Sequence, residues 1–425
     1  MRLKSALATI LCSSVLFGAT AVSAAQTELK LWAWDDNFNI PAAKMAAERF
    51  QAKHPDVTIS VESMAQNDLT QRLNTALAAK NYRTLPDVVL IEDYRVQNFL
   101  TGYPDFLKDI GSQIDLSKFV DHKVAASSDA SGKHYGVPFD AGVVATYLRI
   151  DLFEKAGYTL EDFQDITWDQ FIEMGKKVKE TTGTALLGYD PDDMHLIQAM
   201  MQSAGVWYTN ADATKVTLAG NAAIKEAFTV IKKMHDAGLI VNYSGWTPML
   251  ATFQQDQVAA IVQGCWLTPS LASNEAQSGK WRIVPLPKLN NVPNATHYSN
   301  LGGSQWFANA LSDKSDLAVQ FIKETFATDE DLINQLVPKI TLVTTLKDTS
   351  KITNNNVENP FFGGQKIYAL FADWNTKIPS VNYGPHTRAI ASIISEGLQR
   401  VIAGEDIDTV LQDCQSNAEM QVGLM

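Results

Sequence analysis

The first hundred residues alternate short apolar runs with apolar residues at helical spacing. From Pro41 onward, the alanines that lead to Phe50 recur at the i, i+3, i+4 and i+7 positions of a helix. The predicted elements are a strand at 29–34, a helix from Pro41 that stops at His54-Pro55, a strand at 57–61, a helix at 68–79 and a strand at 87–91. The last run is continuously apolar, as in a strand covered on both faces. This order predicts an α/β domain with a parallel sheet.

A second block of elements follows residues 135–142, which we interpret as a segment that crosses between two parts of the molecule. Thr167 and Gln170 form a capping box before a helix at 168–180. The other predicted elements are a strand at 143–149, a helix at 222–237 ended by Gly238, strands at 258–262 and 302–307, a helix at 317–326, a loop at 349–359 and an amphipathic helix at 390–401. No internal repeat is visible.

The N-terminus has the composition of a secretory leader. Arg2 and Lys4 precede the mostly apolar residues 5–22, and the Val-Ser-Ala of residues 22–24 is a small-residue cleavage site. A membrane-anchoring helix is the alternative, but Ser, Thr and Gly dilute the apolar stretch. We therefore expect a signal peptide at 1–25 and a mature chain that is free in the periplasm.

The three cysteines differ in what they imply. Cys12 lies in the predicted leader, and Leu11 stands where a lipoprotein signal needs a small residue, so we expect Cys12 to be discarded. Cys265 and Cys414 remain in the mature chain, far apart in sequence. In an oxidising compartment they could form a disulfide, and two buried free thiols are the alternative. The sequence leaves their state open.

The mature chain is acidic and long. Removal of Arg2 and Lys4 with the leader takes the formal net charge from -12 to -14. Because phosphate contacts need Lys or Arg, this charge argues against nucleic acid and anionic membrane surfaces as partners. The residues from 26 to 425 exceed what one hydrophobic core usually covers, which predicts two domains. After the leader, no apolar run approaches the roughly 20 residues of a spanning helix.

Carboxylates and indoles follow several predicted strands. Ligands of open parallel sheets bind outside the carboxyl ends of the strands. The candidates are Trp34, Asp35, Asp36 and Asn37 after the first strand, Glu92 and Asp93 after the third, Asp140 near the crossing and Trp266 after the strand at 258–262. Paired acceptors for vicinal hydroxyls and flat apolar faces are what a sugar needs.

Each of these residues also has a simpler interpretation. Asp35 and Asp36 could cap the following helix, and Glu92 and Asp93 could be a solvated strand end. Trp32 is predicted to be a core residue, because it shares the strand interior with Leu31. The recurrence of the same residue types at three equivalent places favours a binding site.

Metal sites and catalytic sites require motifs of particular spacing. Residues 190–195 are rich in aspartate but lack the central Gly and final Glu of a calcium loop, so we expect no metal there. His195 is either a ligand contact or part of a solvated helix cap. Gly302-Gly303-Ser304-Gln305-Trp306 lacks the final Gly of a nucleophile elbow. A pair of carboxylates could still serve a glycoside hydrolase, which stays the alternative to a binding protein.

Seven short motifs together resemble one family. They are Leu31-Trp32-Ala33-Trp34, Phe50 with His54-Pro55, Leu85-Pro86-Asp87-Val88-Val89, Tyr135-Gly136-Val137-Pro138, Thr167-Trp168-Asp169-Gln170-Phe171, Gly264-Cys265-Trp266 and the Gly302-Gly303 strand. In this order they are similar to the family 1 extracellular solute-binding proteins of carbohydrate ABC importers, the maltose-binding-protein-like group. The stretches at 32–35, 90–94, 137–140 and 300–304 look most like the subgroup labelled lactose or L-arabinose transport binding proteins.

The resemblance implies a fold and a function. The fold is a two-lobed α/β periplasmic-binding-protein fold of type II with three inter-lobe crossings. The N-terminal lobe would be residues 26–138 plus 298–350, and the C-terminal lobe residues 139–297 plus 351–425. The function would be capture of a neutral disaccharide or short oligosaccharide for ABC permease subunits, by a monomer without cofactor, metal or enzymatic activity. A chemoreceptor accessory is a weaker possibility.

The resemblance also implies a ligand set in the inter-lobe cleft. The set is Trp34, Asp35, Asp36, Asn37, Gln66, Asn67, Glu92, Asp93, Asp140, His195, Trp246, Trp266, Gly302, Gly303 and Tyr383. Met194 and His195 stand where relatives carry aromatic contacts. Acidic acceptors suit a neutral sugar, and Arg388 is the one cation near the predicted site.

Overall fold

The computed structural model of the chain describes residues 26–423. The predicted leader at 1–25, with Cys12, lies outside the described residues. The strands are β1 (Thr27–Ala33), β2 (Val57–Ser63), β3 (Val88–Glu92), β4 (Gly136–Arg149), β5 (Ala185–Tyr189), β6 (Ile240–Asn242), β7 (Val258–Gly264), β8 (Trp281–Val284) and β9 (Asn300–Ala308). The strand order is β2-β1-β3-β9-β4-β7-β5-β6, and β8 pairs with β4.

Parallel pairing occurs at both ends of this order, and antiparallel pairing in the middle. Strand β1 is parallel to β2 and β3, and β5 is parallel to β6 and β7. Strand β9 is antiparallel to both β3 and β4, and β4 is antiparallel to β7. The predicted parallel sheet is therefore confirmed at the N-terminus, and the strand at 302–307 joins it from two hundred residues away.

Fifteen α-helices are described among residues 26–423. They are α1 (Asn39–Lys53), α2 (Gln66–Ala78), α3 (Asp93–Gly102), α4 (Asp121–Ala126), α5 (Ile150–Lys155), α6 (Trp168–Thr182), α7 (His195–Ser203), α8 (Ala222–Asp236), α9 (Trp246–Gln254), α10 (Thr268–Ala272), α11 (Ser315–Ile322), α12 (Glu330–Ile340), α13 (Ile367–Asn375), α14 (Thr387–Ile402) and α15 (Ile407–Gly423). The capping box of Thr167 and Gln170 at the start of α6 is confirmed.

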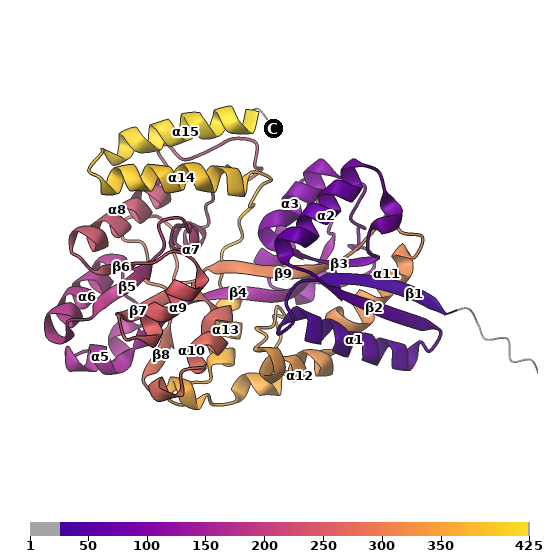
Figure 1. Cartoon of the computed structure of the whole chain (residues 1–425), viewed down its shortest axis with the longest axis horizontal. Helices are drawn as coiled ribbons and strands as arrows, with labels where there is room; N and C mark the ends of the chain where they lie inside the picture. The colour runs from indigo at the N-terminus through magenta and orange to yellow at the C-terminus, as the bar shows by residue number, and fades with distance from the viewer. Residues whose placement is uncertain (1–25, 424–425) are drawn as a thin grey trace, which may run out of the picture.

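Two lobes are visible in Figure 1, and strands β4 and β9 run between them. The first lobe contains β1 to β3 and packs α1, α11 and α12 around Leu31, Phe50 and Trp306. The second lobe holds two clusters, one with α6, α8, α14 and α15 and one with α9 and α13. Each lobe thus has its own hydrophobic interior, as expected for a chain of this length.

Three segments connect the lobes. Strand β4 pairs with β9 through its first half and with β7 and β8 through its second half. Strand β9 returns the chain to the first lobe, where it pairs with β3. Residues 341–366 form the third connection, because α12 packs in the first lobe and α13 in the second. Since β4 and β9 are shared by both lobes, the boundaries at 138, 297 and 350 stay a prediction.

Glycine allows the two crossing strands to approach closely. A Cβ atom on Gly142 of β4 would lie 1.7 Å from the carbonyl oxygen of Leu301 in β9. No larger residue fits there without moving the backbone of β9.

Two further sequence-based expectations are resolved in the described residues. Cys265 and Cys414 are both buried and free, in different hydrophobic clusters. Trp32 is 1% exposed, as predicted for a core residue. No helix within residues 26–423 combines the length and apolar character needed to cross a membrane.

Candidate functional site

A cavity of about 470 Å³ lies between the lobes, beside β9. We call it the central cavity. Its lining residues are Glu92 and Tyr94 from the first lobe, Leu301 and Gly302 from β9, and Asp192, Asp193, Met194, His195, Gln198, Trp266, Thr387, Arg388, Ala391 and Ser392 from the second lobe. Of the predicted ligand set, it brings together Glu92, His195, Trp266 and Gly302.

Glu92 is held in place by a buried arginine. It is the last residue of β3, and Arg95 lies one turn into the following helix. The Arg95 guanidinium donates to Glu92 at 3.0 Å, to Asn67 Oδ1 at 2.8 Å and to Thr70 Oγ1 at 3.0 Å. Arg95 itself is 8% exposed. This clamp fixes the carboxylate at the cavity wall and links it to Asn67, which lies outside the cavity lining.

His195 and Asp193 form a pair on the opposite wall, at the start of α7. His195 Nδ1 lies 2.8 Å from Asp193 Oδ2, and the backbone N–H of His195 donates to the same carboxylate at 2.9 Å. Although desolvation opposes it, the hydrogen bond to Asp193 raises the pKa of His195 above its ordinary value. Asp193 thus holds both the backbone N–H and the imidazole of His195, although α7 has no side-chain cap at its N-cap residue, Met194. Contact of His195 with a ligand stays a prediction.

Trp266 follows β7 and is fixed against the crossing strand. Its indole Nε1 donates to the carbonyl of Leu301 at 3.0 Å. A Cβ on Gly264 would lie 2.2 Å from that indole nitrogen, so only glycine leaves room for the ring. His195 approaches the ring at 6.1 Å between centroids.

Trp246 extends this aromatic surface outward. It begins α9, lies 5.8 Å from the Trp266 ring and is 49% exposed. A largely exposed indole beside a cavity wall offers an apolar face to a ligand. Trp246 is not part of the cavity lining, so its contribution stays a prediction.

Tyr94, which lines the cavity, packs against Tyr383 behind it, where the lobes touch. Their rings lie 4.6 Å apart, nearly perpendicular to each other. Tyr94 hydrogen-bonds to β9 through the Asn300 carbonyl and the Gly302 N–H, both at 3.4 Å. Tyr383 is 3% exposed and donates to Gln202 at 3.1 Å. Tyr383, predicted to touch a ligand, is therefore placed in the wall rather than in the lining.

Two predicted acceptors, Asp93 and Asp140, are instead part of a buried ionic network. Asp93 pairs with the fully buried Lys123 and accepts a hydrogen bond from Gln305 at 3.0 Å. Asp140 accepts from the backbone N–H of Ser304 at 2.9 Å and from its hydroxyl. Neither carboxylate lines the central cavity. Both oxygens of Asp93, and Oδ1 of Asp140, are bonded to groups at the crossing instead.

Burial changes the proton affinity of both carboxyl groups. It raises the pKa of Asp93 to about 6, although Lys123 works in the opposite direction. Burial also raises the pKa of Asp140 above its ordinary value. Gly303, with φ of +88°, lies against this network, since a Cβ there would be 2.8 Å from the Lys123 ammonium. The structure thus places Gly303 in the packing of the crossing.

The residues after β1 lie apart from the cavity lining. Asp35 accepts from the N–H of Asn37 at 2.8 Å, and Asn39 Oδ1 accepts from the N–H groups of Trp34 and Asp35. These contacts build the turn into α1, as in the helix-entry alternative. Trp34 is half-buried against the first-lobe clusters, and Asp36 and Gln66 are not in the lining either. Their contact with a ligand stays a prediction.

Sequence reasoning missed several lining residues. Gln198 and Thr387 gave no signal, since each is a single polar residue in a helical pattern. Asp192 and Asp193 were visible as an acidic run but were assigned to a solvated cap. Arg388 was noted as the one nearby cation, and it does line the cavity. Within residues 26–423, no group of three or more His, Cys, Asp or Glu side chains is placed to hold a metal ion.

Comparison with known proteins agrees with this architecture. A profile of the family described as bacterial extracellular solute-binding protein matches residues 45–359. The chain is 37% identical to the lactose-binding protein of Rhizobium radiobacter over 420 residues, which are 99% of this chain and 98% of that protein.

Solved structures share the fold at low sequence identity. The sugar-binding protein MalE of Xanthomonas citri superposes with a TM-score of 0.76 at 17% identity, covering 93% of this chain and 97% of that chain. An ABC transporter associated binding protein from B. animalis subsp. lactis, solved with β-1,6-galactobiose, gives a TM-score of 0.68 at 22% identity, covering 93% and 98%. From its profile match and its full-length relative, the chain belongs to the bacterial extracellular solute-binding protein family.

Proposed function

We propose that this protein captures a neutral disaccharide or short oligosaccharide in the central cavity and delivers it to the permease subunits of an ABC importer. The observation that carries the proposal is the cavity between the lobes, where Glu92 and Trp266 come from opposite sides. A carboxylate accepts hydrogen bonds from vicinal hydroxyls, and an indole covers the apolar face of a pyranose. The full-length relative named for lactose binding supports the class of ligand.

Closure of the lobes would couple binding to delivery. A ligand that contacts both walls stabilises the arrangement in which the walls are closest, by its differential affinity for that state. The permease would then recognise the closed conformation of the binding protein. Location outside the cytoplasmic membrane, after cleavage of the predicted leader, is part of the same proposal.

The charge around the cavity favours a neutral ligand. Glu92 is paired with Arg95, so its charge is already balanced within the protein. Asp193 lies 2.8 Å from His195, and this contact raises the pKa of the imidazole. Asp192 and Arg388 line the cavity with opposite signs. The carboxylate of a uronide would be attracted by Arg388 but repelled by Asp192.

The test is calorimetry of the mature protein with lactose, arabino-oligosaccharides and galacturonides. Binding of a neutral sugar without galacturonide binding is expected. Tight binding of galacturonides alone would overturn the proposal of a neutral ligand. A parallel assay for newly released reducing ends addresses the hydrolase alternative, and turnover of lactose would replace the binding role by an enzymatic one.

A further inference from the structure

The two nitrogens of the His195 imidazole lie in different surroundings. Nδ1 is 2.8 Å from Asp193 Oδ2 and 3.4 Å from the side-chain nitrogen of Gln263. Gln263 lines a small pocket behind the ring, whereas His195 also lines the central cavity. Since the two nitrogens of an imidazole point in nearly opposite directions, Nε2 faces away from Asp193.

Nε2 is the accessible nitrogen of this ring. Within residues 26–423 it makes no hydrogen bond, and it is not one of the buried polar atoms that lack a partner. The His195 side chain is 37% exposed, so Nε2 reaches open space. His195 lines the central cavity, which is the space that the proposed sugar would occupy.

The contacts of Nδ1 decide which nitrogen carries the proton. The Asp193 carboxylate only accepts hydrogen bonds, so it pairs with Nδ1 as an N–H donor. The Gln263 amide nitrogen only donates, and its contact with Nδ1 is the longer of the two. With a proton on Nδ1, Nε2 is an acceptor in the neutral ring and a donor in the imidazolium.

Acidic groups around the imidazole favour its charged form. Asp190 and Asp193 approach from the loop before α7, and Glu92 approaches from the end of β3 in the first lobe. Although desolvation opposes it, the hydrogen bond and charge of Asp193, together with the charges of Glu92 and Asp190, raise the pKa of His195.

Other polar groups face the ring from five further elements. They are Tyr94 of α3, Tyr189 of β5, Tyr243 after β6, Gln263 of β7, and Asp192 and Arg388, which line the central cavity. Burial raises the pKa of all three tyrosines, which keeps them neutral. Among the residues that line either pocket, Arg388 is the one permanent cation that opposes the imidazolium.

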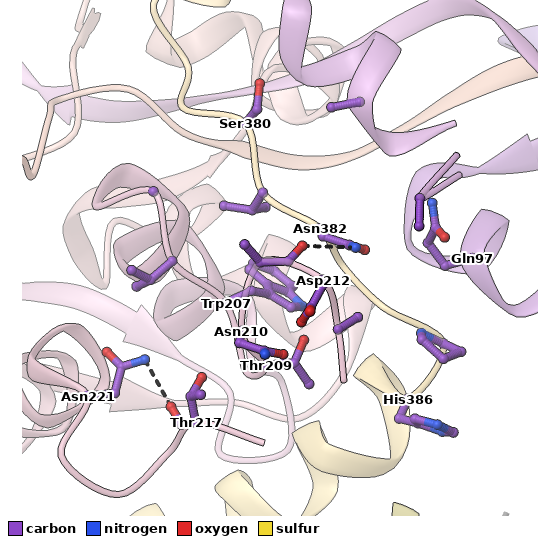
Figure 2. A pocket seen from close by; sticks show the side chains of 18 of the residues that line it. Gln97, Trp207, Thr209, Asn210, Asp212, Thr217, Asn221, Ser380, Asn382 and His386 are labelled. Carbon is purple, nitrogen blue, oxygen red and sulfur yellow. Dashed lines mark hydrogen bonds between the residues drawn. The ribbon is translucent and has the colours of Figure 1, made fainter. Parts of the chain in front are cut away.

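A second histidine lies in a neighbouring cavity. Trp207 lines that larger cavity, of about 1340 Å³, and its ring stacks 5.7 Å from Tyr94 of the central cavity. Figure 2 shows the larger cavity, with His386 among its side chains. Desolvation lowers the pKa of His386, so its neutral ring is favoured. His195 is therefore the histidine that lines the proposed sugar site.

From this geometry we infer that His195 binds the sugar as an imidazolium, which donates from Nε2 to a ligand oxygen, and that Asp193 is the positioning residue that holds Nδ1. The inference rests on the proposed function and describes how the same site is regulated. The ring and glycosidic oxygens of a saccharide can only accept, and a charged donor makes the stronger hydrogen bond. Sugar binding is therefore coupled to proton uptake at His195.

This coupling fixes the direction of the pH dependence. Below the pKa of His195 in the free protein, the imidazolium is already present and the affinity is highest. As the pH rises through that pKa toward the higher pKa of the complex, binding must take up a proton and the affinity falls. We expect a loss of about threefold between about pH 7 and about pH 9, from the difference between charged and neutral hydrogen bonds.

The experiment is calorimetry of the mature protein at these two pH values, with the neutral sugar that binds most tightly among lactose and the arabino-oligosaccharides. At about pH 7.5, titrations in phosphate and in Tris count the protons, because each proton taken up is released by the buffer. The wild type should give different binding enthalpies in the two buffers.

Three variants separate the role of His195 from other effects. His195→Gln keeps an N–H donor that does not titrate, so the pH dependence and the buffer difference should disappear. Asp193→Asn removes the charge beside Nδ1 and should move the fall in affinity to lower pH. His235→Gln is the control, since His235 is exposed on α8 and lines neither pocket, and it should keep the wild-type profile.

The inference is overturned if the wild type binds sugar with one affinity at both pH values and one enthalpy in both buffers. It also fails if His195→Gln keeps the wild-type pH dependence, because Asp93, with its pKa of about 6, and Asp140 are unchanged in that variant. An unshifted profile in Asp193→Asn would remove the positioning role. Absence of any neutral-sugar binding would instead overturn the proposed function and this inference together. Melting temperatures establish that each variant is folded.

Discussion

The Trp266 indole nitrogen donates a hydrogen bond to the Leu301 carbonyl at 3.0 Å, which ties this tryptophan of the second lobe to a strand that crosses into the first. The bond fixes the ring plane, so the surface offered to a ligand is preorganised and its position follows the crossing. Preorganised aromatic surfaces lose little conformational entropy on binding.

Replacing Trp266 by Ala is expected to weaken lactose binding by about 1–3 kcal/mol, because the buried aromatic contact is lost. Calorimetry of the two proteins measures the difference directly. Tyr82→Ala is the control, since Tyr82 is an exposed aromatic residue outside the central cavity. Equal affinity of Trp266→Ala and wild type would remove Trp266 from the site.

Glu92→Gln is expected to weaken binding by about 1.5–3 kcal/mol, the usual worth of hydrogen bonds to a charged group. Arg95→Met should weaken it in the same direction, although Arg95 does not line the cavity, because Glu92 loses its clamp. Sugar titrations of both variants check this. A loss in Glu92→Gln with full affinity in Arg95→Met would contradict the positioning role of Arg95.

Lys123→Met is expected to destabilise the protein by about 3–5 kcal/mol near neutral pH, since Asp93 would remain buried without its partner. Without Lys123, the pKa of Asp93 in the folded state rises above its present value of about 6, far above the ordinary 3.8. Between the pKa of Asp93 in the unfolded chain and its higher pKa in the folded variant, the folded state binds more protons than the unfolded state. The free energy of unfolding of Lys123→Met therefore falls as the pH rises through that interval.

Urea titrations at about pH 5 and about pH 7.5 test this sign, and the deficit of Lys123→Met should be smaller at the lower pH. Lys225→Met provides the control, because Lys225 pairs with Asp408 at the surface and should matter little at either pH. A deficit that did not depend on pH would show that Asp93 does not take up the proton.

Gly142→Ala is expected to lower stability by about 1–3 kcal/mol or more, because the new methyl group would collide with the Leu301 carbonyl of β9. Gly102→Ala is the matched control, since no atom lies within 4 Å of a Cβ at that position. Thermal unfolding of the two variants should separate them clearly, and equal melting temperatures would mean that β4 and β9 can move apart freely.

Thiol titration should find no reactive cysteine in the native protein and two in the denatured protein without reductant. Both Cys265 and Cys414 are buried, and burial raises the pKa of Cys414 to about 11 and that of Cys265 further. Low thiolate content and poor access both slow the reaction. Absence of thiols after denaturation would instead reveal a disulfide.

Much of the fold could be predicted, because local patterns decide it. The capping box at Thr167 and the apolar run at 87–91 are encoded within a few neighbouring residues. The helix α6 and the strand β3 (Val88–Glu92) formed there, with β3 shifted by one residue. The length of β4 could not be predicted from neighbouring residues. It pairs with three strands from two lobes, and such pairing depends on residues more than a hundred positions away.

The site was only partly predictable for a related reason. Glu92 and Asp93 are adjacent and look equivalent in sequence, yet one faces the central cavity and the other is buried against Lys123. The difference arises because β3 ends and α3 begins between them, which turns the two side chains apart. Similarly, Asp140 accepts a hydrogen bond from Ser304, a partner that no local sequence pattern identifies.

The pairing of β3 with β9 has a consequence for how the chain emerges during synthesis. The inner edge of the first lobe's sheet is completed by residues 300–308, so the backbone groups of residues 88–92 have no native neighbour on that side until most of the polypeptide has been made. Long-range pairing of this kind slows folding. During synthesis, this edge of the first lobe's sheet therefore lacks its native partner until residue 308 has been added.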